Sequence, residues 1–151
     1  MERIPSFSVD HTNLQKGMYI SRIDAPDIIT YDLRMKRPNK GDYLSTGGMH
    51  TLEHIFATYA RNGAYKDSVI YVGPMGCRTG FYLITRGLPH TDAIRLVQEA
   101  MDFVATFEGD IPGASAPECG NYADQNLPEA RAVAADMALV LQGWTEDALA
   151  Y

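Results

Sequence analysis

Segment 46–62 constrains this chain more than any other, because its pattern is that of an amphipathic helix with two unlike faces. Ser45 or Thr46 provides the N-cap, and Gly63 marks the C-terminal end. Its large apolar side chains recur at the i, i+3, i+4 and i+7 spacing of an α-helix, and they are Leu52, Ile55, Phe56 and Tyr59. This face has to pack against a core. The opposite face is therefore left for polar groups.

That opposite face carries two histidines and a glutamate, within the sequence HTLEH at residues 50–54. Residues four apart project from the same side of a helix, so His50 and His54 can reach one metal ion, with Glu53 beside them. A tightly held ion needs at least three protein ligands, and a catalytic ion keeps one further position open. The spacing leaves four candidates for the third ligand, which are Cys119, Cys77, His11 and His90. The alternative is a polar face that only meets water.

If the polar stripe forms a site, another part of the protein has to wall it in. The stripe extends along the helix to Ala57 and Arg61, away from the apolar face. The loop around Cys77, the segment around Cys119 and a second subunit are the three possibilities that the sequence offers.

The remaining patterns predict an α+β fold in one domain, residues 1–151. Ile-, Tyr- and Thr-rich stretches at 17–23 and 27–34 predict a hairpin, and two further strands are expected at 68–73 and 79–85. Helical periodicity predicts helices at 91–108 and 128–142, with an irregular segment at 111–117 between them. This mixture is typical of an antiparallel sheet packed against helices.

Charge and hydropathy exclude several classes of partner. The net charge is −6, and 13 basic residues are spread among 19 acidic ones, with no basic run longer than residues 35–37. Nucleic acid binding and attachment to an anionic membrane both depend on clustered Lys and Arg, so neither is expected. No apolar signal stretch follows the N-terminus, and the longest apolar run, residues 69–72, is too short to span a bilayer. We expect a cytoplasmic location.

The two cysteines are expected to be metal ligands, catalytic thiols or free thiols rather than a disulfide pair. Cys77 lies between glycines in a turn that joins two predicted strands, next to Arg78. A cationic neighbour favours a reactive thiolate there. Cys119 precedes Gly120 in an irregular stretch, which suits metal binding. For each cysteine, the alternative is a buried and inert side chain.

Five segments of the chain resemble those of the S-ribosylhomocysteine lyase (LuxS) family, in the family's order. They are the HTLEH motif at 50–54, PMGCRTGFY at 74–82, Cys119-Gly120, residues 6–11, and residues 31–34 with 37–39. The resemblance implies the LuxS-like α+β fold. It also implies a carbon–sulfur lyase that cleaves S-ribosylhomocysteine to homocysteine and 4,5-dihydroxy-2,3-pentanedione, the precursor of the quorum-sensing signal autoinducer-2.

The same resemblance implies a role for each matching residue. His50, His54 and Cys119 would bind the metal, and Cys77 and Glu53 would be the acid–base pair. The substrate-binding residues would be Ser6, His11, Arg34 and Arg61. The implied metal is iron, Fe(II), although a site of this kind also accepts Zn(II) and Co(II). The implied assembly is a homodimer with active sites at the subunit interface.

The sequence departs from the family pattern at one place. Many members carry Asp-Ile-Ser before the PMGC turn, where this chain has Tyr71-Val72-Gly73. The contacts of that Asp and that Ser are therefore not carried over to this chain.

Two other functions remain open from the residues alone. A zinc peptidase of the inverted HxxEH type would use Glu53 as its base and would need a carboxylate as third ligand. A non-catalytic structural module would need Cys77 and Cys119 on the same ion, because structural zinc sites usually have four protein ligands.

Overall fold

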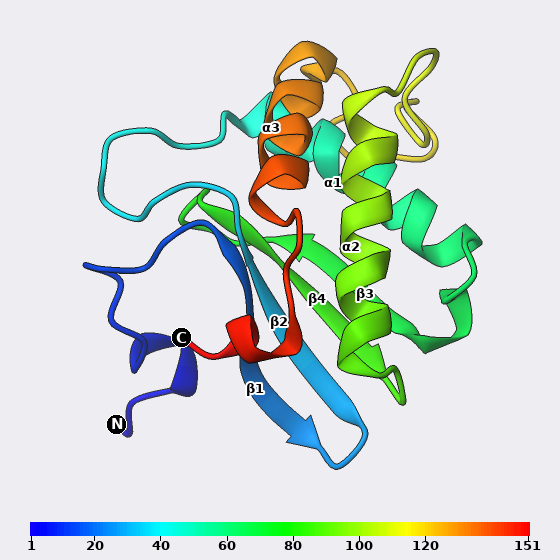
Figure 1. The fold of residues 1–151 in the computed structure, drawn as a ribbon. Coiled ribbons are helices and arrows are strands. Elements are labelled where there is room, and N and C mark those ends of the chain that lie inside the picture. The colour runs from blue at the N-terminus through cyan, green and yellow to red at the C-terminus, as the bar shows by residue number, and fades with distance from the viewer.

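The computed structural model describes residues 1–151, which form a four-stranded antiparallel sheet and three α-helices (Figure 1). The strands are β1 (Gly17–Ala25), β2 (Ile28–Arg34), β3 (Val69–Pro74) and β4 (Gly80–Arg86), in the order β1-β2-β4-β3. The helices are α1 (Thr46–Asn62), α2 (His90–Ala105) and α3 (Leu127–Val140). The predicted α+β class is confirmed.

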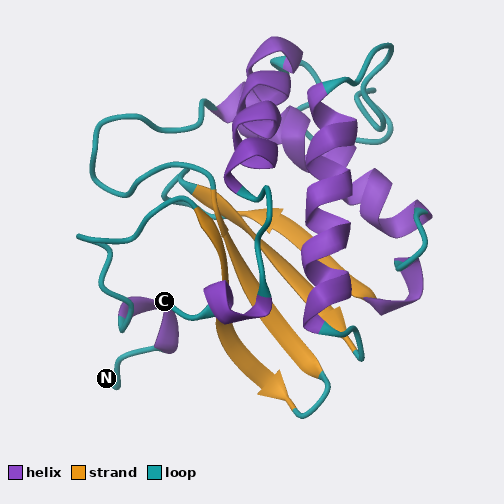
Figure 2. Cartoon of the chain, viewed as in Figure 1, coloured by secondary structure: helices purple, strands orange, loops and turns teal.

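The helices cover one face of the sheet, and the hydrophobic core lies between the two layers (Figure 2). Strand residues that pair across the sheet point to the same face. On β2 and β4, Leu33 pairs with Phe81, and both are fully buried in the core against side chains of the helices. The apolar face predicted for α1 packs here too, because Leu52 and Phe56 have no exposed surface.

The other face of the sheet is polar at its centre. Asp32 of β2 lies opposite Tyr82 of β4 and Tyr19 of β1 in the strand register, so the three side chains share that face. The C-terminal residues pass around the β1 edge of the sheet. Leu149 is buried in the core, whereas the hydroxyl of Tyr151 donates to Asp32 on the polar face.

The first turn of α1 is fixed by contacts with α3. The side chain of Ser45 accepts a hydrogen bond from the Gly48 amide at 3.0 Å, as an N-cap does. Glu129 of α3 accepts from the Ser45 amide at 2.9 Å and also from its hydroxyl. Gly48 leaves room for this carboxylate, because a Cβ there would overlap the Glu129 side chain. The start of the histidine helix is thereby held against α3.

The predicted elements are present, with small shifts at their ends. The hairpin, the helix at 46–62 and the helix at 128–142 agree closely with β1, β2, α1 and α3. The helix expected at 91–108 ends earlier, at Ala105, because the Thr106 hydroxyl and amide both bond to the Asp102 carbonyl and close the last turn. The two later strands begin and end one residue after their predicted positions.

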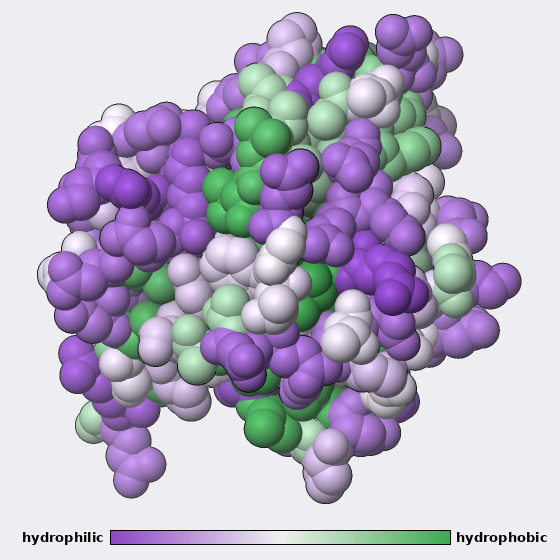
Figure 3. Space-filling view, viewed as in Figure 1, coloured by the Kyte–Doolittle hydropathy of each residue, from purple (hydrophilic) through white to green (hydrophobic).

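The surface is mixed in character. In Figure 3, hydrophilic side chains cover most of the visible face, and apolar groups form separate patches. None of the helices has both the length and the apolarity needed to cross a membrane.

Candidate functional site

The two histidines of α1 meet Cys119 on the polar side of the helix. One ligand atom from each of these three side chains lies within 4.8 Å of the other two. Cys119 Sγ is 3.3 Å from His50 Nε2, and the rings of His50 and His54 stand nearly perpendicular with their centres 4.5 Å apart. All three residues are half-buried. The fold therefore selects Cys119 among the four candidates that sequence spacing left open.

The hydrogen bonds of the two imidazoles suit metal binding. His50 Nδ1 lies 2.8 Å from the carbonyl oxygen of Asp124, and His54 Nδ1 lies 2.6 Å from that of Pro112. A carbonyl oxygen only accepts, so each Nδ1 carries the ring proton and each Nε2 keeps its lone pair. Metal-bound histidines usually have such a partner on the second nitrogen, which fixes the tautomer and the ring orientation. The two imidazoles and the thiol thus fit a divalent transition metal.

The segment between α2 and α3 walls in this face of α1. It supplies both carbonyls and Cys119, and it is the loop at the upper right of Figure 1. Gly113, with φ +68°, lets the backbone approach closely, because a Cβ there would lie 3.3 Å from His54 Nδ1. Buried Thr51 holds the far end of the segment, donating to Gln125 Oε1 at 2.7 Å and accepting from the Asn126 amide at 2.9 Å. Within one chain, the wall is therefore the Cys119 segment and not the loop around Cys77.

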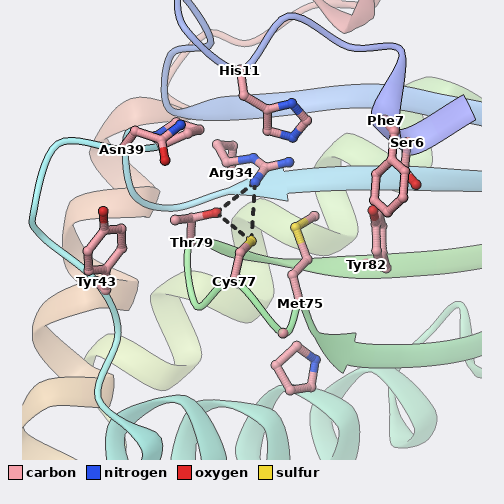
Figure 4. A pocket seen from close by; sticks show the side chains of 13 residues that line it. Ser6, Phe7, His11, Arg34, Asn39, Tyr43, Met75, Cys77, Thr79 and Tyr82 are labelled. Atoms are coloured by element: carbon pink, nitrogen blue, oxygen red, sulfur yellow. Dashed lines mark hydrogen bonds between the residues drawn. The ribbon is translucent and has the colours of Figure 1, made fainter.

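A cavity of about 570 Å³ opens around Cys77 at the polar face of the sheet (Figure 4). Its lining includes four residues singled out from the sequence, which are Ser6, His11, Arg34 and Cys77. They come from the N-terminal segment, the end of β2 and the turn between β3 and β4. The structure therefore brings these four together from distant parts of the chain. None of the three clustered residues His50, His54 and Cys119 lines this cavity.

Arg34 is the charged centre of the cavity wall. Its side chain is 3% exposed and forms a two-pronged ion pair with Asp32, with Nη2–Oδ2 at 2.6 Å and Nε–Oδ1 at 3.1 Å. Burial opposes the charged form of Arg34, but the attraction of Asp32 outweighs it, so the pKa of Arg34 is raised. The guanidinium therefore presents a permanent positive charge next to Cys77, whose sulfur lies 3.9 Å from Nη1.

Glu53 and Arg61 lie on α1 outside the Cys77 cavity. Glu53 is half-buried beside the histidines. Arg61 is exposed and donates to the backbone carbonyl of Ile70 on β3. Within one chain, neither side chain lines the cavity, so the acid–base role of Glu53 and the substrate-binding role of Arg61 stay predictions.

Sequence reasoning did not assign roles to several residues of the cavity region, notably Asp32 and Thr79. One signal was present, because Asp32 and Arg34 are opposite charges two residues apart in a strand and so must share a face. The turn itself also depends on Arg78, which has φ +60° and donates its amide to the Met75 carbonyl at 2.9 Å. This left-handed residue directly follows Cys77 and shapes the tight return of the chain.

The departure from the family pattern has a local structural consequence. Tyr71 folds its ring over Gly73, and a Cβ at Gly73 would overlap the Tyr71 hydroxyl. A serine at this position would therefore require the exposed Tyr71 side chain to move aside.

Comparisons with known proteins agree with the geometry. Residues 4–147 match the family model described as S-Ribosylhomocysteinase (LuxS). The chain is 46% identical to the S-ribosylhomocysteine lyase of Clostridium acetobutylicum, over 100% of this chain and 99% of the relative. It is 45% identical to that of Phocaeicola vulgatus over 100% and 98%, and 50% identical to that of Clostridium beijerinckii over 89% and 87%. This chain belongs to the S-ribosylhomocysteine lyase (LuxS) family.

Proposed function

We propose that this protein is a metal-dependent S-ribosylhomocysteine lyase. It cleaves the thioether of S-ribosylhomocysteine to homocysteine and 4,5-dihydroxy-2,3-pentanedione, the precursor of autoinducer-2. The observation that carries the proposal is the convergence of His50, His54 and Cys119, whose ligand atoms lie within 4.8 Å of one another. The relatives of this chain are named S-ribosylhomocysteine lyase. Membership of the family supports the same reaction.

We propose that His50 and His54, through Nε2, and Cys119, through its sulfur, hold the metal. When bound, the metal would act as a Lewis acid toward the sugar oxygens, and three protein ligands would leave it one position open to the substrate. Iron, Fe(II), is the proposed metal, and a ligand set of two imidazoles and a thiolate also accepts Zn(II) or Co(II).

The rest of the chemistry requires protons to move between neighbouring atoms of the sugar. The thioether leaves only after the carbonyl has migrated from C1 to C2 and then to C3, which makes the proton next to the departing sulfur acidic. Cys77 takes a proton from one carbon and returns it to the next, and Glu53 moves protons at the oxygens. β-Elimination then releases homocysteine. Ser6, His11, Arg34 and Arg61 bind the substrate around this acid–base pair.

A homodimer with active sites at the subunit interface is part of the proposal. Its support is that the metal ligands do not line the cavity around Cys77 within one chain. Several large apolar side chains on the N-terminal segment and the edge strands are also exposed, which are Ile4, Phe7, Ile23, Ile70 and Tyr71. Such groups suit burial against a second copy. The cytoplasmic location expected from the sequence stays a prediction.

The geometry does not favour the two alternatives. A peptidase of the inverted HxxEH type needs a carboxylate as third ligand, whereas the third member of this cluster is the sulfur of Cys119. A closed structural site with two sulfurs would need Cys77 in the cluster, but Cys77 lines the separate cavity.

The test is to add S-ribosylhomocysteine to protein purified without oxygen and to measure released homocysteine thiol. Cys77→Ala should keep metal near the wild-type content and lose turnover, because it removes the base and no ligand. Cys119→Ala should lose metal as well as activity, because two histidines alone hold an ion weakly. A fully active Cys77→Ala protein, or normal metal occupancy in Cys119→Ala, would contradict the assigned roles.

A further inference from the structure

A continuous row of hydrogen bonds runs from Tyr151 to the sulfur of Cys77. Tyr151 Oη donates to Asp32 Oδ2 at 2.7 Å, and Asp32 in turn accepts from Arg34. Arg34 Nη1 then donates to Thr79 Oγ1 at 2.6 Å, and Thr79 Oγ1 lies 3.1 Å from Cys77 Sγ (Figure 4). The row joins residues from β2, the β3–β4 turn and the C-terminal segment.

The chemistry of these groups fixes the direction of the hydrogen bond between Arg34 and Thr79. A guanidinium has no acceptor, so Thr79 Oγ1 must accept from Arg34. The hydroxyl hydrogen of Thr79 is then free to point at the Cys77 sulfur. When the Thr79 hydroxyl donates to Cys77 Sγ, the sulfur receives hydrogens from both Thr79 and the more distant Arg34 Nη1, which is an arrangement that stabilises a thiolate.

Asp32 and Tyr151, the two residues of the row beyond Arg34, hold the guanidinium in place. Both side chains of the Asp32–Arg34 pair are almost fully buried, with 2% of Asp32 and 3% of Arg34 exposed. Asp32 takes the Nε and Nη2 edge of Arg34, which leaves Nη1 directed at Thr79. Tyr151 supplies the third donor to the buried carboxylate, and its ring stacks on Tyr19 with centres 5.0 Å apart. Burial and the charge of Asp32 raise the pKa of Tyr151, which keeps its hydroxyl protonated and a donor.

We propose that Thr79, Asp32 and Tyr151 are positioning residues that orient hydrogen-bond donors onto the Cys77 sulfur and so hold it as a thiolate. The inference rests on the proposed role of Cys77 as the base. It adds to that role the source of the thiolate, which is a set of buried contacts within one chain. The C-terminal segment, far from Cys77 in the sequence, thereby contributes to the reactivity of the thiol.

The test is the rate at which iodoacetamide alkylates Cys77 in the metal-loaded protein, at a pH below the midpoint of the wild-type alkylation profile, where the thiolate is only partly formed. Tryptic cleavage after Lys66 and Arg78 places Cys77 in a different peptide from Cys119, so mass spectrometry follows each sulfur separately. The thiolate is the reacting form. As the pKa of the thiol falls, the thiolate population rises more steeply than the nucleophilicity of each thiolate falls. A donor that stabilises the thiolate therefore increases the rate.

Thr79→Val should slow alkylation of Cys77 about tenfold, because it removes a donor to a charged sulfur. Thr79→Ser keeps the hydroxyl and should react at close to the wild-type rate. Tyr151→Phe should slow the reaction about twofold to threefold, since the hydrogen bond that it removes acts through Asp32 and Arg34. The matched control is Tyr19→Phe, which deletes the hydroxyl of the stacked partner and should have no effect.

Alkylation of Thr79→Val at the wild-type rate would overturn the proposal. Equal rates for Tyr151→Phe and Tyr19→Phe would overturn the role proposed for Tyr151. The measurement needs no substrate, so it is independent of the lyase assay. Full turnover by Cys77→Ala would contradict the proposed function alone, whereas unchanged alkylation of Thr79→Val would contradict the row of donors alone.

Discussion

At the scale of single residues, the most demanding feature is the buried ion pair of Asp32 and Arg34 in the central strand β2. Each charge loses its hydration, which costs several kcal/mol unless good geometry and further hydrogen bonds offset it. Here the carboxylate accepts two hydrogen bonds from Arg34 and a third from Tyr151. The pair is therefore maintained next to the Cys77 thiol by contacts that satisfy both charges.

Asp32→Asn should lower the free energy of unfolding by about 3 kcal/mol, because it leaves the buried guanidinium of Arg34 without its counter-charge. Urea titration followed by circular dichroism measures the change. The control is Asp27→Asn, whose pair with Arg86 is 3.9 Å long with both side chains more than half exposed. That change should stay within about 0.5 kcal/mol. Equal effects of the two substitutions would show that the buried pair contributes no special stability.

At the scale of elements, helix α1 carries the two histidines and is held at several points along its length. Its first turn contacts Glu129 of α3, and its polar side is covered by the segment that carries Cys119. Its apolar side is buried against the sheet. Fixed in this way, the helix keeps both imidazoles in one orientation before any metal binds, and this reduces the entropy lost on binding.

Glu129→Gln should lower the free energy of unfolding by about 1 kcal/mol, because the neutral amide no longer complements the positive end of the α1 dipole. Ser45 also loses its charged acceptor in this variant. Urea unfolding of the metal-free protein measures the effect. The comparison is Glu108→Gln, at an exposed position after α2, which should unfold like the wild type. A Glu129→Gln protein as stable as Glu108→Gln would mean that this contact does not hold the helix.

At the scale of the whole molecule, the group of His50, His54 and Cys119 and the Cys77 cavity have no residue in common within one chain. The proposed dimer would resolve this separation by bringing Cys77 of one subunit to the metal ligands of the other. Closed twofold symmetry would then create two equivalent sites. The subunit arrangement therefore has a direct consequence for activity.

Mixing inactive Cys77→Ala and Cys119→Ala chains, with unfolding and refolding to exchange subunits, should restore activity. Only the mixed dimer pairs an intact metal site with an intact Cys77, and it has one such site. Random assembly predicts about a quarter of the wild-type activity. Refolded wild-type protein gives the reference, and each variant refolded alone should stay inactive. A mixture that forms dimers yet stays inactive would place both groups of each site in one chain.

The sequence by itself determined the helices and strands, and it placed the two histidines of α1 on one side of that helix. Periodicity of apolar residues is a local property, so α1 and the β1–β2 hairpin could be predicted closely, as could the shared side of His50 and His54. The motifs at 50–54 and 74–82 also identified the family before any coordinates. These inferences need only neighbouring residues, whose geometry a helix or strand dictates.

Only the tertiary structure decided which distant groups meet. Cys119 comes to His50 across 69 residues, and Tyr151 comes to Asp32 across 119, through irregular segments that have no periodicity to read. The carbonyls of Pro112 and Asp124 that orient the imidazoles are backbone atoms, which every residue type carries. Their partners depend on the packing of the whole chain. Long-range contacts of this kind arise from the folded core and not from local preference, and for that reason the sequence alone left them open.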